Sequence, residues 1–409
     1  MLFHPRSPFY VLRHPNFRLF WAGHLISRIG SEMQVIGIIW HVYILTGSAF
    51  SLAFIGLARF IPFLLFSLLG GITSDLVSRK KIIFVSHILM GLVAFSLAIL
   101  TQQNIISTGS IFLLLALNSI FTAFDSPARQ SIIPLLVPRE ELVKAYSLNT
   151  MLVQSSIVLG PAIGGFLIAY LGVGSIYFVN AFSFLAVVVG ILFMGPLNQE
   201  KSQVSFTPRS IFEGFRFVFS TPLISSTTLL DFFATFFSSA MVLMPIFAHE
   251  ILRVGPQGLG FLYAAPAVGS IVAGLVFTSF THMKNQGKII IIAVALYGTA
   301  TILFGLSRSF YLSLFLLGLS GIGDGLSTII RNSIRQLITP DHLRGRMSSV
   351  TMLFFWGGPQ LGEVEAGLVA GLFSAPVAVI TGGVATLFAT FLIDRFTPQL
   401  RKYQGHEHL

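Results

Sequence analysis

Three side chains that can do chemistry follow one another at helical spacing near the start of the chain. In the stretch GHLISRIGSEM, residues 23–33, His24, Arg28 and Glu32 stand four residues apart. On an α-helix each is rotated by about 40° from the one before, so the three share one stripe. A guanidinium can hold an anionic group, and a carboxylate or an imidazole can take up and release a proton. The stripe therefore predicts an anion- or proton-binding site; the alternative is an internal ion pair that only stabilises helix packing.

The surroundings of this stripe make its charges costly. It lies within an apolar run at about residues 19–45, and a charged side chain at the centre of a lipid-facing helix costs roughly 2.5–3.5 kcal/mol on an insertion scale. The whole chain has this character, because 54% of its 409 residues are hydrophobic and only 10% are charged. Soluble domains carry about 25% charged residues. We therefore predict a multi-pass membrane protein in which the stripe faces the interior of a helix bundle.

Apolar runs bounded by turn residues and charges predict twelve transmembrane helices and no soluble domain. The predicted helices are approximately 19–45, 51–73, 82–101, 109–130, 147–170, 174–195, 223–249, 257–280, 288–306, 309–330, 347–372 and 375–394. The longest polar interruption falls near the middle of the chain. We expect a six-helix bundle at 1–195, a cytoplasmic linker at 196–222, a second six-helix bundle at 223–394 and a cytoplasmic tail at 395–409.

The distribution of basic residues predicts the orientation in the membrane. If the N-terminus is cytoplasmic, the outer loops hold only Arg253 and Arg308, while Arg28 and Arg59 lie inside helices. The remaining 21 of the 25 lysines and arginines then fall on the cytoplasmic side. Because positive charge accumulates on that side of membrane proteins, we expect both termini in the cytoplasm. The net charge of +10 is then explained by topology and by attraction to anionic lipid, with no nucleic-acid partner.

The two halves of the sequence repeat. Residues 129–138, RQSIIPLLVP, align without gaps on residues 331–340, RNSIRQLITP, and the arginine, serine, isoleucine, leucine and final proline are identical. Both segments end the fourth predicted helix of their half and lead into a basic loop, which puts Arg129, Arg331 and Arg335 on the cytoplasmic side. Two parallel six-helix repeats related by an axis along the membrane normal are the architecture of the major facilitator transporters.

A loop between the second and third predicted helices resembles a motif of that superfamily. The segment GITSDLVSRKK, which begins at Gly71, matches G-x-x-x-D-R-x-G-R-R at the glycine, at Asp75 and at the basic pair Arg79 and Lys80, and departs from it at two positions. The resemblance implies that Gly71 lets two helices approach closely. It also implies that Arg79 pairs with Asp125 on the fourth helix, so that the charges form a gate that opens and closes the cytoplasmic side. The alternative is a basic loop that only sets topology.

The fifth predicted helix carries a second motif. Gly160, Pro161, Gly164 and Gly165 resemble G-x-x-x-G-P-x-x-G-G, a signature of major facilitator exporters, with Ser156 in place of the leading glycine. Small residues allow a neighbouring helix to pack closely, and the proline removes a backbone hydrogen bond. The resemblance favours an exporter, against the alternative of ordinary small-residue packing.

A third resemblance is the most specific. The segment 124–142, FDSPARQSIIPLLVPREEL, is similar to one subgroup of major facilitator exporters that includes the enterobactin exporter and macrolide efflux proteins. Further matches at 16–20, 45–48 and 343–346 extend the similarity over nearly the whole chain. The resemblance implies a twelve-helix exporter of the bacterial inner membrane. It implies proton entry as the driving force and an amphipathic substrate, such as a siderophore or a drug whose efflux confers multidrug resistance.

Within the predicted helices, a small set of side chains could bind substrate or protons. They are His24, Arg28, Glu32, Arg59, Asp231, Asp324, Glu363, Glu365 and Trp356. Arg28 and Arg59 favour a substrate with anionic character, the five acids are candidate proton carriers, and the tryptophan could line the cavity. Two alternatives to export remain, a proton-coupled importer of a small anionic solute and a non-transporting membrane sensor or scaffold with the same fold.

No enzyme site competes with this interpretation. The chain has no phosphate-binding G-x-x-x-x-G-K-[ST] loop, so we expect neither direct use of ATP nor any other cofactor. It has no cysteine, and its ten histidines include no pair at metal-ligand spacing on a helix, so no metal site is expected. The expected partners are membrane lipid, a small-molecule substrate and protons, and the protein is expected to be a monomer.

Overall fold

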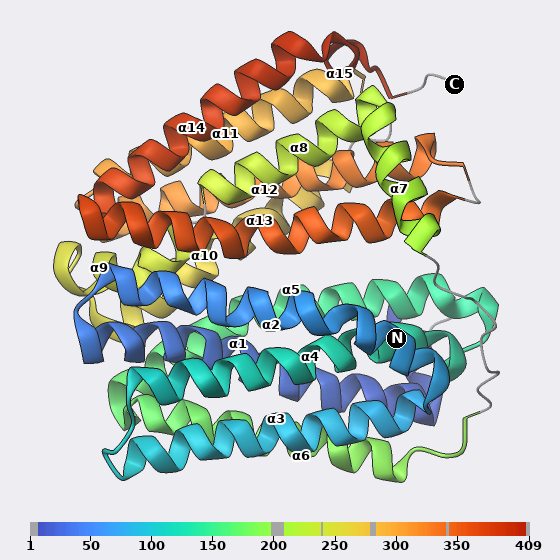
Figure 1. The fold of residues 1–409 in the computed structure, drawn as a ribbon, viewed down its shortest axis with the longest axis vertical. Coiled ribbons are helices and arrows are strands. Elements are labelled where there is room, and N and C mark those ends of the chain that lie inside the picture. Colours follow the sequence, from blue (N-terminus) through green and yellow to red (C-terminus); the bar gives the residue numbers. More distant parts are fainter. Residues whose placement is uncertain (1–6, 198–207, 239, 279–283, 341–342, 406–409) are drawn as a thin grey trace. The chain divides into compact units, whose positions relative to one another are not determined.

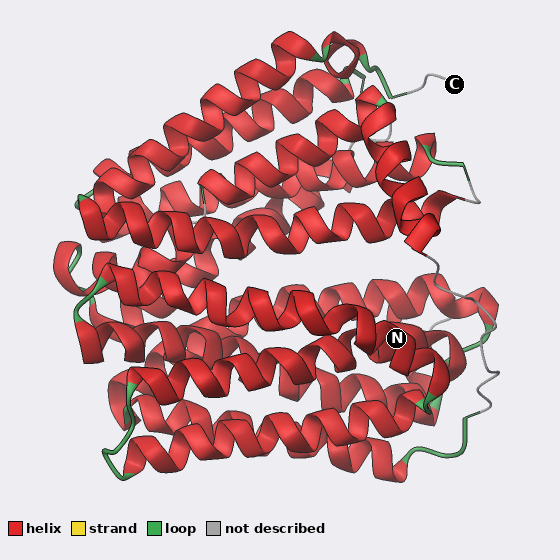
Figure 2. Ribbon diagram, viewed as in Figure 1, coloured by secondary structure: helices red, strands yellow, loops and turns green. Residues whose placement is uncertain are grey.

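The computed structural model describes residues 7–197, 208–238, 240–278, 284–340 and 343–405. In these ranges the chain is helical and contains no strand (Figure 2). Its internal contacts divide it into two compact units. Unit 1 comprises Met1–Gly47, Ala58–Val204 and Gly255–Gly260, and unit 2 comprises Ser48–Leu57, Ser205–Val254 and Phe261–Leu409.

The first half of the chain forms six long helices of 21 to 32 residues (Figure 1). A short 3₁₀ turn, η1 (Pro8–Arg13), precedes them, and another, η2 (Arg139–Glu141), joins the fourth to the fifth. The six helices are α1 (Pro15–Thr46), α2 (Ala49–Leu76), α3 (Arg79–Gln102), α4 (Thr108–Leu136), α5 (Leu142–Leu171) and α6 (Val173–Phe193).

The second half begins with a short helix, α7 (Pro208–Ser220), inside the segment 196–222 that was expected to be a linker. Residues 198–207 of that segment, and residues 406–409 of the expected tail, lie outside the described residues. The remaining elements are α8 (Pro222–Phe237), η3 (Ala240–Leu243), α9 (Met244–Ile246), the π-helix η4 (Phe247–Ile251), α10 (Gly255–Thr278), α11 (Gln286–Leu306), α12 (Phe310–Ile338), α13 (Arg344–Leu372), α14 (Ala375–Phe396) and α15 (Pro398–Lys402).

Several helices end where local chemistry predicts. At the C-terminus of α1, Gly47 takes a left-handed conformation with φ of 59°, and its N–H donates to the carbonyl of Tyr43 at 2.7 Å. A glycine adopts this conformation without steric cost, which explains why the helix stops there. At the N-terminus of α4, the hydroxyl groups of Ser107 and Ser110 each accept from the other residue's backbone N–H, at 3.2 and 2.9 Å. This reciprocal pair satisfies two N–H groups that the helix itself leaves without a partner.

Eleven helical segments among the described residues are long and apolar enough to cross a membrane. The remaining predicted span, 347–372, lies in α13, which at 29 residues is also long enough but is less apolar because it carries Glu363 and Glu365. The predicted all-α membrane fold is therefore confirmed. Two predicted helix ends fall well short: α4 continues to Leu136, past the predicted limit of 130, and α12 continues to Ile338, past the predicted limit of 330.

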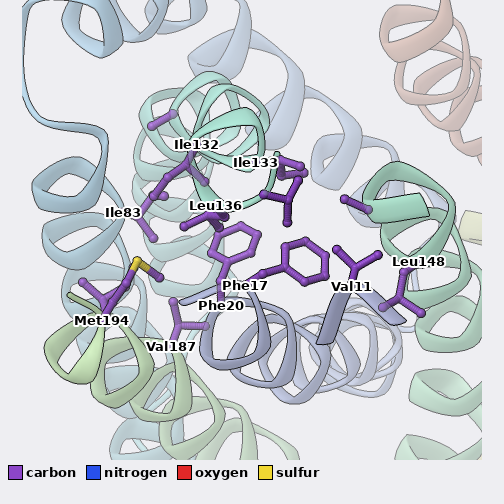
Figure 3. Packing of buried hydrophobic residues seen from close by; sticks show 14 of the residues in the cluster. Val11, Phe17, Phe20, Ile83, Ile132, Ile133, Leu136, Leu148, Val187 and Met194 are labelled. Atoms are coloured by element: carbon purple, nitrogen blue, oxygen red, sulfur yellow. The ribbon is translucent and has the colours of Figure 1, made fainter. Parts of the chain in front are cut away.

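The core of unit 1 is an apolar cluster near the N-terminal end of α1 (Figure 3). Phe17 and Phe20 of α1 pack there with Ile83 of α3, Ile132 of α4 and Leu148 of α5, and all five are at most 3% exposed. Other large apolar side chains of the six helices are, by contrast, exposed. Leu65 is 65% exposed, Leu113 is 63% exposed and Phe193 is 76% exposed. An apolar core inside an apolar exterior is the arrangement that a lipid environment requires.

The last helix among the described residues, α15, is built into unit 2. Leu400 of α15 and Tyr403, which follows it, are buried in the same cluster as residues of α8, α11 and α12. The backbone N–H of Gly287, at the start of α11, donates to the carbonyl of Tyr403 at 3.0 Å. A Cβ at position 287 would lie 1.6 Å from the Leu400 carbonyl oxygen, so only glycine fits there.

We therefore expect Gly287→Ala to lower the free energy of unfolding by about 1–3 kcal/mol, the usual cost of overpacking a filled site. Thermal unfolding of the purified protein in detergent would measure the change. Gly345→Ala is the matched control, because Gly345 is also the second residue of its helix and has no atom within 4 Å of an added Cβ. Equal stability of the two variants would contradict the proposed packing of α15.

Candidate functional site

The stripe on α1 faces the interior of unit 1, as its polarity requires. His24 is only 3% exposed, and the side chains of Arg28 and Glu32 are 28% and 17% exposed. An Nη atom of Arg28 lies 2.7 Å from a carboxylate oxygen of Glu32, one turn further along the helix. The Nε of Arg28 is buried without a hydrogen-bond partner among the described residues. Arg28 therefore keeps an unused donor beside an ion pair.

The glycines of α5 bring that helix against the same part of α1. A Cβ at Gly160 would lie 2.5 Å from the Cβ of Glu32, and one at Gly164 would lie 3.0 Å from the side chain of Ile36. Neither position can carry a larger residue unless the two helices move apart. Gly165 lies against the backbone of Gly260, which belongs to the same unit. The glycines of the exporter-like motif thus allow α5 to pack directly against α1 at Glu32.

Next to this pair, unit 1 holds a buried group of charged and polar side chains. We call His24, His87 of α3, and Asp125 and Arg129 of α4 the unit-1 cluster. One oxygen of the Asp125 carboxylate lies 3.1 Å from the Nε of Arg129, and the other lies 3.4 Å from the Nδ1 of His87. The His24 and His87 rings are 5.4 Å apart between centroids. The cluster joins α1, α3 and α4.

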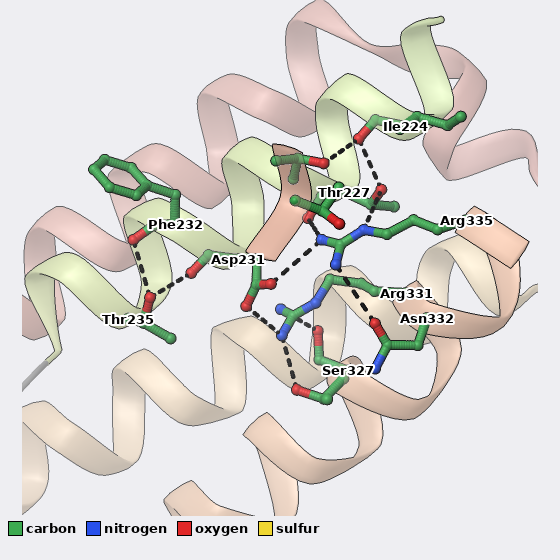
Figure 4. A network of polar contacts seen from close by, with 12 residues as sticks. Ile224, Thr227, Asp231, Phe232, Thr235, Ser327, Arg331, Asn332 and Arg335 are labelled. Carbon is green, nitrogen blue, oxygen red and sulfur yellow. Dashed lines mark hydrogen bonds and ion pairs between the residues drawn. The ribbon is translucent and has the colours of Figure 1, made fainter. Parts of the chain in front are cut away.

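Unit 2 holds a second group, which we call the unit-2 cluster: Asp231 of α8 and Asp324, Arg331 and Arg335 of α12. Figure 4 shows the carboxylate of Asp231 with its two arginines. Arg331 donates to one oxygen of Asp231 at 2.8 Å, and Arg335 donates to the other at 3.3 Å. Asp231, Arg331 and Arg335 are at most 5% exposed. One carboxylate therefore holds two buried guanidinium groups.

The remaining acid of this cluster is held more loosely. Asp324 lies 3.7 Å from Arg331, and 40% of its side chain is exposed. Arg331 has closer partners than Asp324. Besides its contact with Asp231, it donates to the hydroxyl of Ser327 at 2.8 Å and to that of Thr328 at 2.9 Å. Loss of charge at Asp324 would therefore leave the contact between Asp231 and its two arginines in place.

The two clusters differ in a way that follows the sequence repeat. Arg129 and Arg331 are equivalent at an offset of 202 residues, and both are held by an acid. In unit 2 the acid is Asp231 on α8, whose counterpart at an offset of 203 is Arg28. An arginine there cannot neutralise Arg129, and the acid is instead Asp125 on the same helix, where unit 2 has Ser327. Both halves therefore share the arginine, but the carboxylate that neutralises it lies at a different position in each half.

Arg331 and Arg335 lie beyond the predicted helix limit of 330, and that limit is wrong. Both lie inside α12 and are buried, because Asp231 compensates their charge and lets the helix continue through them. His87 was not among the predicted site residues at all. The repeated arginine in both halves was a signal that could have pointed to Arg129 and Arg331, whereas nothing in the spacing of His87 marks it.

Two of the proposed gate residues make contacts within unit 1. Asp125 contacts His87 and Arg129, and Arg79 donates to the backbone carbonyl of Ser131 at 2.8 Å. Lys80 donates to the carbonyl of Met194.

The close approach that was expected at Gly71 occurs at the preceding residue. Within unit 1, a Cβ on Gly71 would meet no atom within 4 Å, whereas one on Gly70 would lie 2.1 Å from the carbonyl oxygen of Ala123. The expectation for Gly71 is corrected by one position, because one residue rotates a helix face by about 100°.

The other predicted site residues lie on α2 and α13. Arg59 is half-buried on α2, in unit 1, and Trp356 is half-buried on α13, in unit 2. Glu363 is 8% exposed. The Oε2 of Glu365, which is half-buried two residues further on, has no hydrogen-bond partner among the described residues.

Comparison with known proteins agrees with this architecture. A family model described as "Transmembrane secretion effector" matches residues 6–407. Proteins named enterobactin exporter EntS, from Shigella boydii serotype 18 and Escherichia coli O127:H6, are each 25% identical over 96% of this chain and 94% of their own.

Solved transporter structures share the fold. A bacterial homologue of the human lysosomal transporter Spinster matches with a TM-score of 0.73 and 17% identity, over 97% of this chain and 99% of that one. A POT family transporter matches with a TM-score of 0.73 and 13% identity, over 94% and 96%. With long apolar helices in the described residues of both units and a family match over residues 6–407, the chain belongs to the transmembrane secretion effectors, a family of transporters with the major facilitator fold.

Proposed function

We propose that this transporter exports an anionic, amphipathic small molecule across the bacterial inner membrane in exchange for protons, with both chain termini in the cytoplasm. The observation that carries the proposal is the state of Arg28. It is a partly exposed guanidinium inside an apolar bundle, it is held by one carboxylate, and its Nε donor is unused. Such a group can exchange Glu32 for an anionic group of a substrate at little electrostatic cost, because one ion pair replaces another.

The relatives support a siderophore as the substrate class. The similar proteins from Shigella and Escherichia are named as enterobactin exporters. At 25% identity the substrate itself can differ, so the shared property that we propose is an anionic, amphipathic molecule of that kind.

Proton coupling requires an acid that can lose its charge without breaking the bundle. Asp231 does not meet this condition, because it neutralises two buried arginines. Asp324 does, because it is partly exposed and secondary to Asp231 as a partner of Arg331. We therefore propose Asp324 as the proton carrier, ahead of Glu32, which already pairs with Arg28.

Direction and coupling can be tested in inverted membrane vesicles. An untargeted comparison of metabolites in the medium of cells with and without the gene first identifies the exported compound. An exporter then accumulates that compound in inverted vesicles whose interior is acid, an importer releases it, and a sensor or scaffold does neither. Labelled enterobactin is the first probe to use.

Arg28→Lys is expected to weaken substrate binding by about tenfold or more while protein abundance stays near normal. Lysine keeps the charge but loses the flat, forked set of donors. Equilibrium binding of the exported compound to purified protein would measure the loss. Arg308→Lys, at an exposed position outside both clusters, is the matched control. Normal transport by the double variant Arg28→Met, Glu32→Gln would show that the pair is only structural.

Asp324→Asn is expected to abolish accumulation driven by a proton gradient and to retain exchange of labelled for unlabelled substrate, because an amide cannot release a proton. Asp231→Asn should instead lower the amount of folded protein, since leaving buried charges uncompensated costs about 3–5 kcal/mol. Vesicle transport and membrane abundance separate the two effects. Gradient-driven accumulation at the wild-type level in Asp324→Asn would exclude Asp324 as the proton carrier. Glu32, Glu363 and Glu365 would then be the remaining candidates.

The gate proposal, which rests on the family motif, has its own test. Asp75→Asn changes a charge on a half-buried side chain with little change in packing. We expect transport to fall severalfold while membrane abundance remains near that of the wild type. A turnover rate equal to the wild type would mean that the loop only sets topology.

A further inference from the structure

We propose that His24, His87 and Asp125 form a binding site for a divalent transition-metal ion inside unit 1. The three residues come from α1, α3 and α4, and each is only 3% exposed. They are the three members of the unit-1 cluster that can donate a lone pair to a metal, the fourth being Arg129. Two imidazoles and one carboxylate are a ligand set that metal sites in proteins use repeatedly.

The ligand atoms are close enough to share one ion. One donor atom from each of the three residues lies within 4.8 Å of the other two. A tetrahedral ion with bonds of about 2.1 Å keeps its ligand atoms about 3.4 Å apart. A pair of ligand atoms at 4.8 Å must therefore close by about 1.4 Å to share one tetrahedral ion.

Two of the three residues carry buried atoms that the protein does not use. The Nδ1 of His24 and the Oδ1 of Asp125 are buried and have no hydrogen-bond partner among the described residues. Buried polar atoms without a partner are uncommon and destabilising in native proteins. The aromatic rings of Phe20 and Phe184 lie against the two histidines and leave them no polar neighbour on that side. A ligand that accepts lone pairs would satisfy both atoms.

The surrounding contacts orient the side chains for this role. The Nδ1 of His87 donates to the backbone carbonyl of Ile83 at 2.9 Å, which leaves the lone pair of the ring on Nε2. Metal-bound histidines commonly make this contact through their other nitrogen. Arg129 holds Oδ2 of the Asp125 carboxylate, so Oδ1 is the oxygen left for an ion.

Charge decides which ions the site can take. It offers a single carboxylate, and that carboxylate already neutralises Arg129, so a divalent ion brings charge that nothing in the cluster balances. Mg²⁺ and Ca²⁺ need several oxygen ligands and are therefore excluded. Zn²⁺, Co²⁺ and Ni²⁺ bind neutral imidazole well and are the class that fits. The guanidinium of Arg129 should weaken their binding.

The second half of the chain offers a comparison within the same molecule. At the repeat offsets, His24 corresponds to Thr227 and Asp125 to Ser327. The hydroxyl of Ser327 accepts from Arg331, and both Thr227 oxygens lie within hydrogen-bond distance of Arg335. There the equivalent positions are satisfied by the protein itself. At these two pairs of positions, unit 1 therefore carries metal-ligating side chains and unit 2 carries hydroxyl side chains.

The experiment is a titration of the purified full-length protein in detergent with Co²⁺, followed by the visible absorption of the bound ion and competed with Zn²⁺. The tail histidines His406 and His408 are replaced by glutamine in every sample, and no histidine tag is used. We expect one ion per chain. His24→Gln, His87→Gln and Asp125→Asn should each weaken binding by more than about tenfold.

His41→Gln is the matched control, since His41 is also a buried histidine of α1 but contacts Tyr177, away from the cluster. It should leave Co²⁺ binding unchanged. Arg129→Gln keeps all three ligands and should tighten binding at least tenfold by removing a neighbouring positive charge. No Co²⁺ binding by the parent protein, binding that survives all three ligand substitutions, or binding that Arg129→Gln fails to tighten would overturn the proposal.

Discussion

A charge inside a lipid-embedded helix bundle needs a counter-charge within reach, and this constraint shapes both units of the protein. The carboxylate of Asp231 between Arg331 and Arg335 is the clearest case. Its presence on α8 allows α12 to carry two arginines through the bundle as a continuous helix. In unit 1 the same arginine position is neutralised from its own helix by Asp125. The polar chemistry of each unit is arranged around one repeated guanidinium.

Close helix packing is the second condition, because a counter-charge acts only at short range. Gly160 brings the backbone of α5 onto the Cβ of Glu32, and Gly70 brings α2 onto the carbonyl of Ala123. Both positions lie within regular helix, so no special backbone conformation requires glycine there. Glycine is required because any larger residue would clash with the neighbouring helix. Gly160 of the exporter-like motif therefore helps to position a charged group that belongs to another helix.

Much of the fold could be predicted from the sequence, because apolar runs, basic loops and the repeated decapeptide are local or periodic signals. The partners of the charged residues could not. Arg331 and Arg335 end an apolar run, so hydropathy places a helix boundary before them, and only Asp231, some 100 residues away, explains why the helix continues. His87 is likewise inconspicuous, because its neighbours His24 and Asp125 stand on two other helices. Spacing along one helix cannot reveal a group assembled from three.

The embedding of the C-terminal turn has a practical consequence for anyone who labels or fuses this protein. The carbonyl of Tyr403 is a structural hydrogen-bond acceptor for the start of α11, and the Leu400 side chain is fully buried. A fluorescent protein or affinity handle joined directly after Lys402 would therefore replace part of the folded bundle. A junction placed after Gly405 keeps both of these contacts.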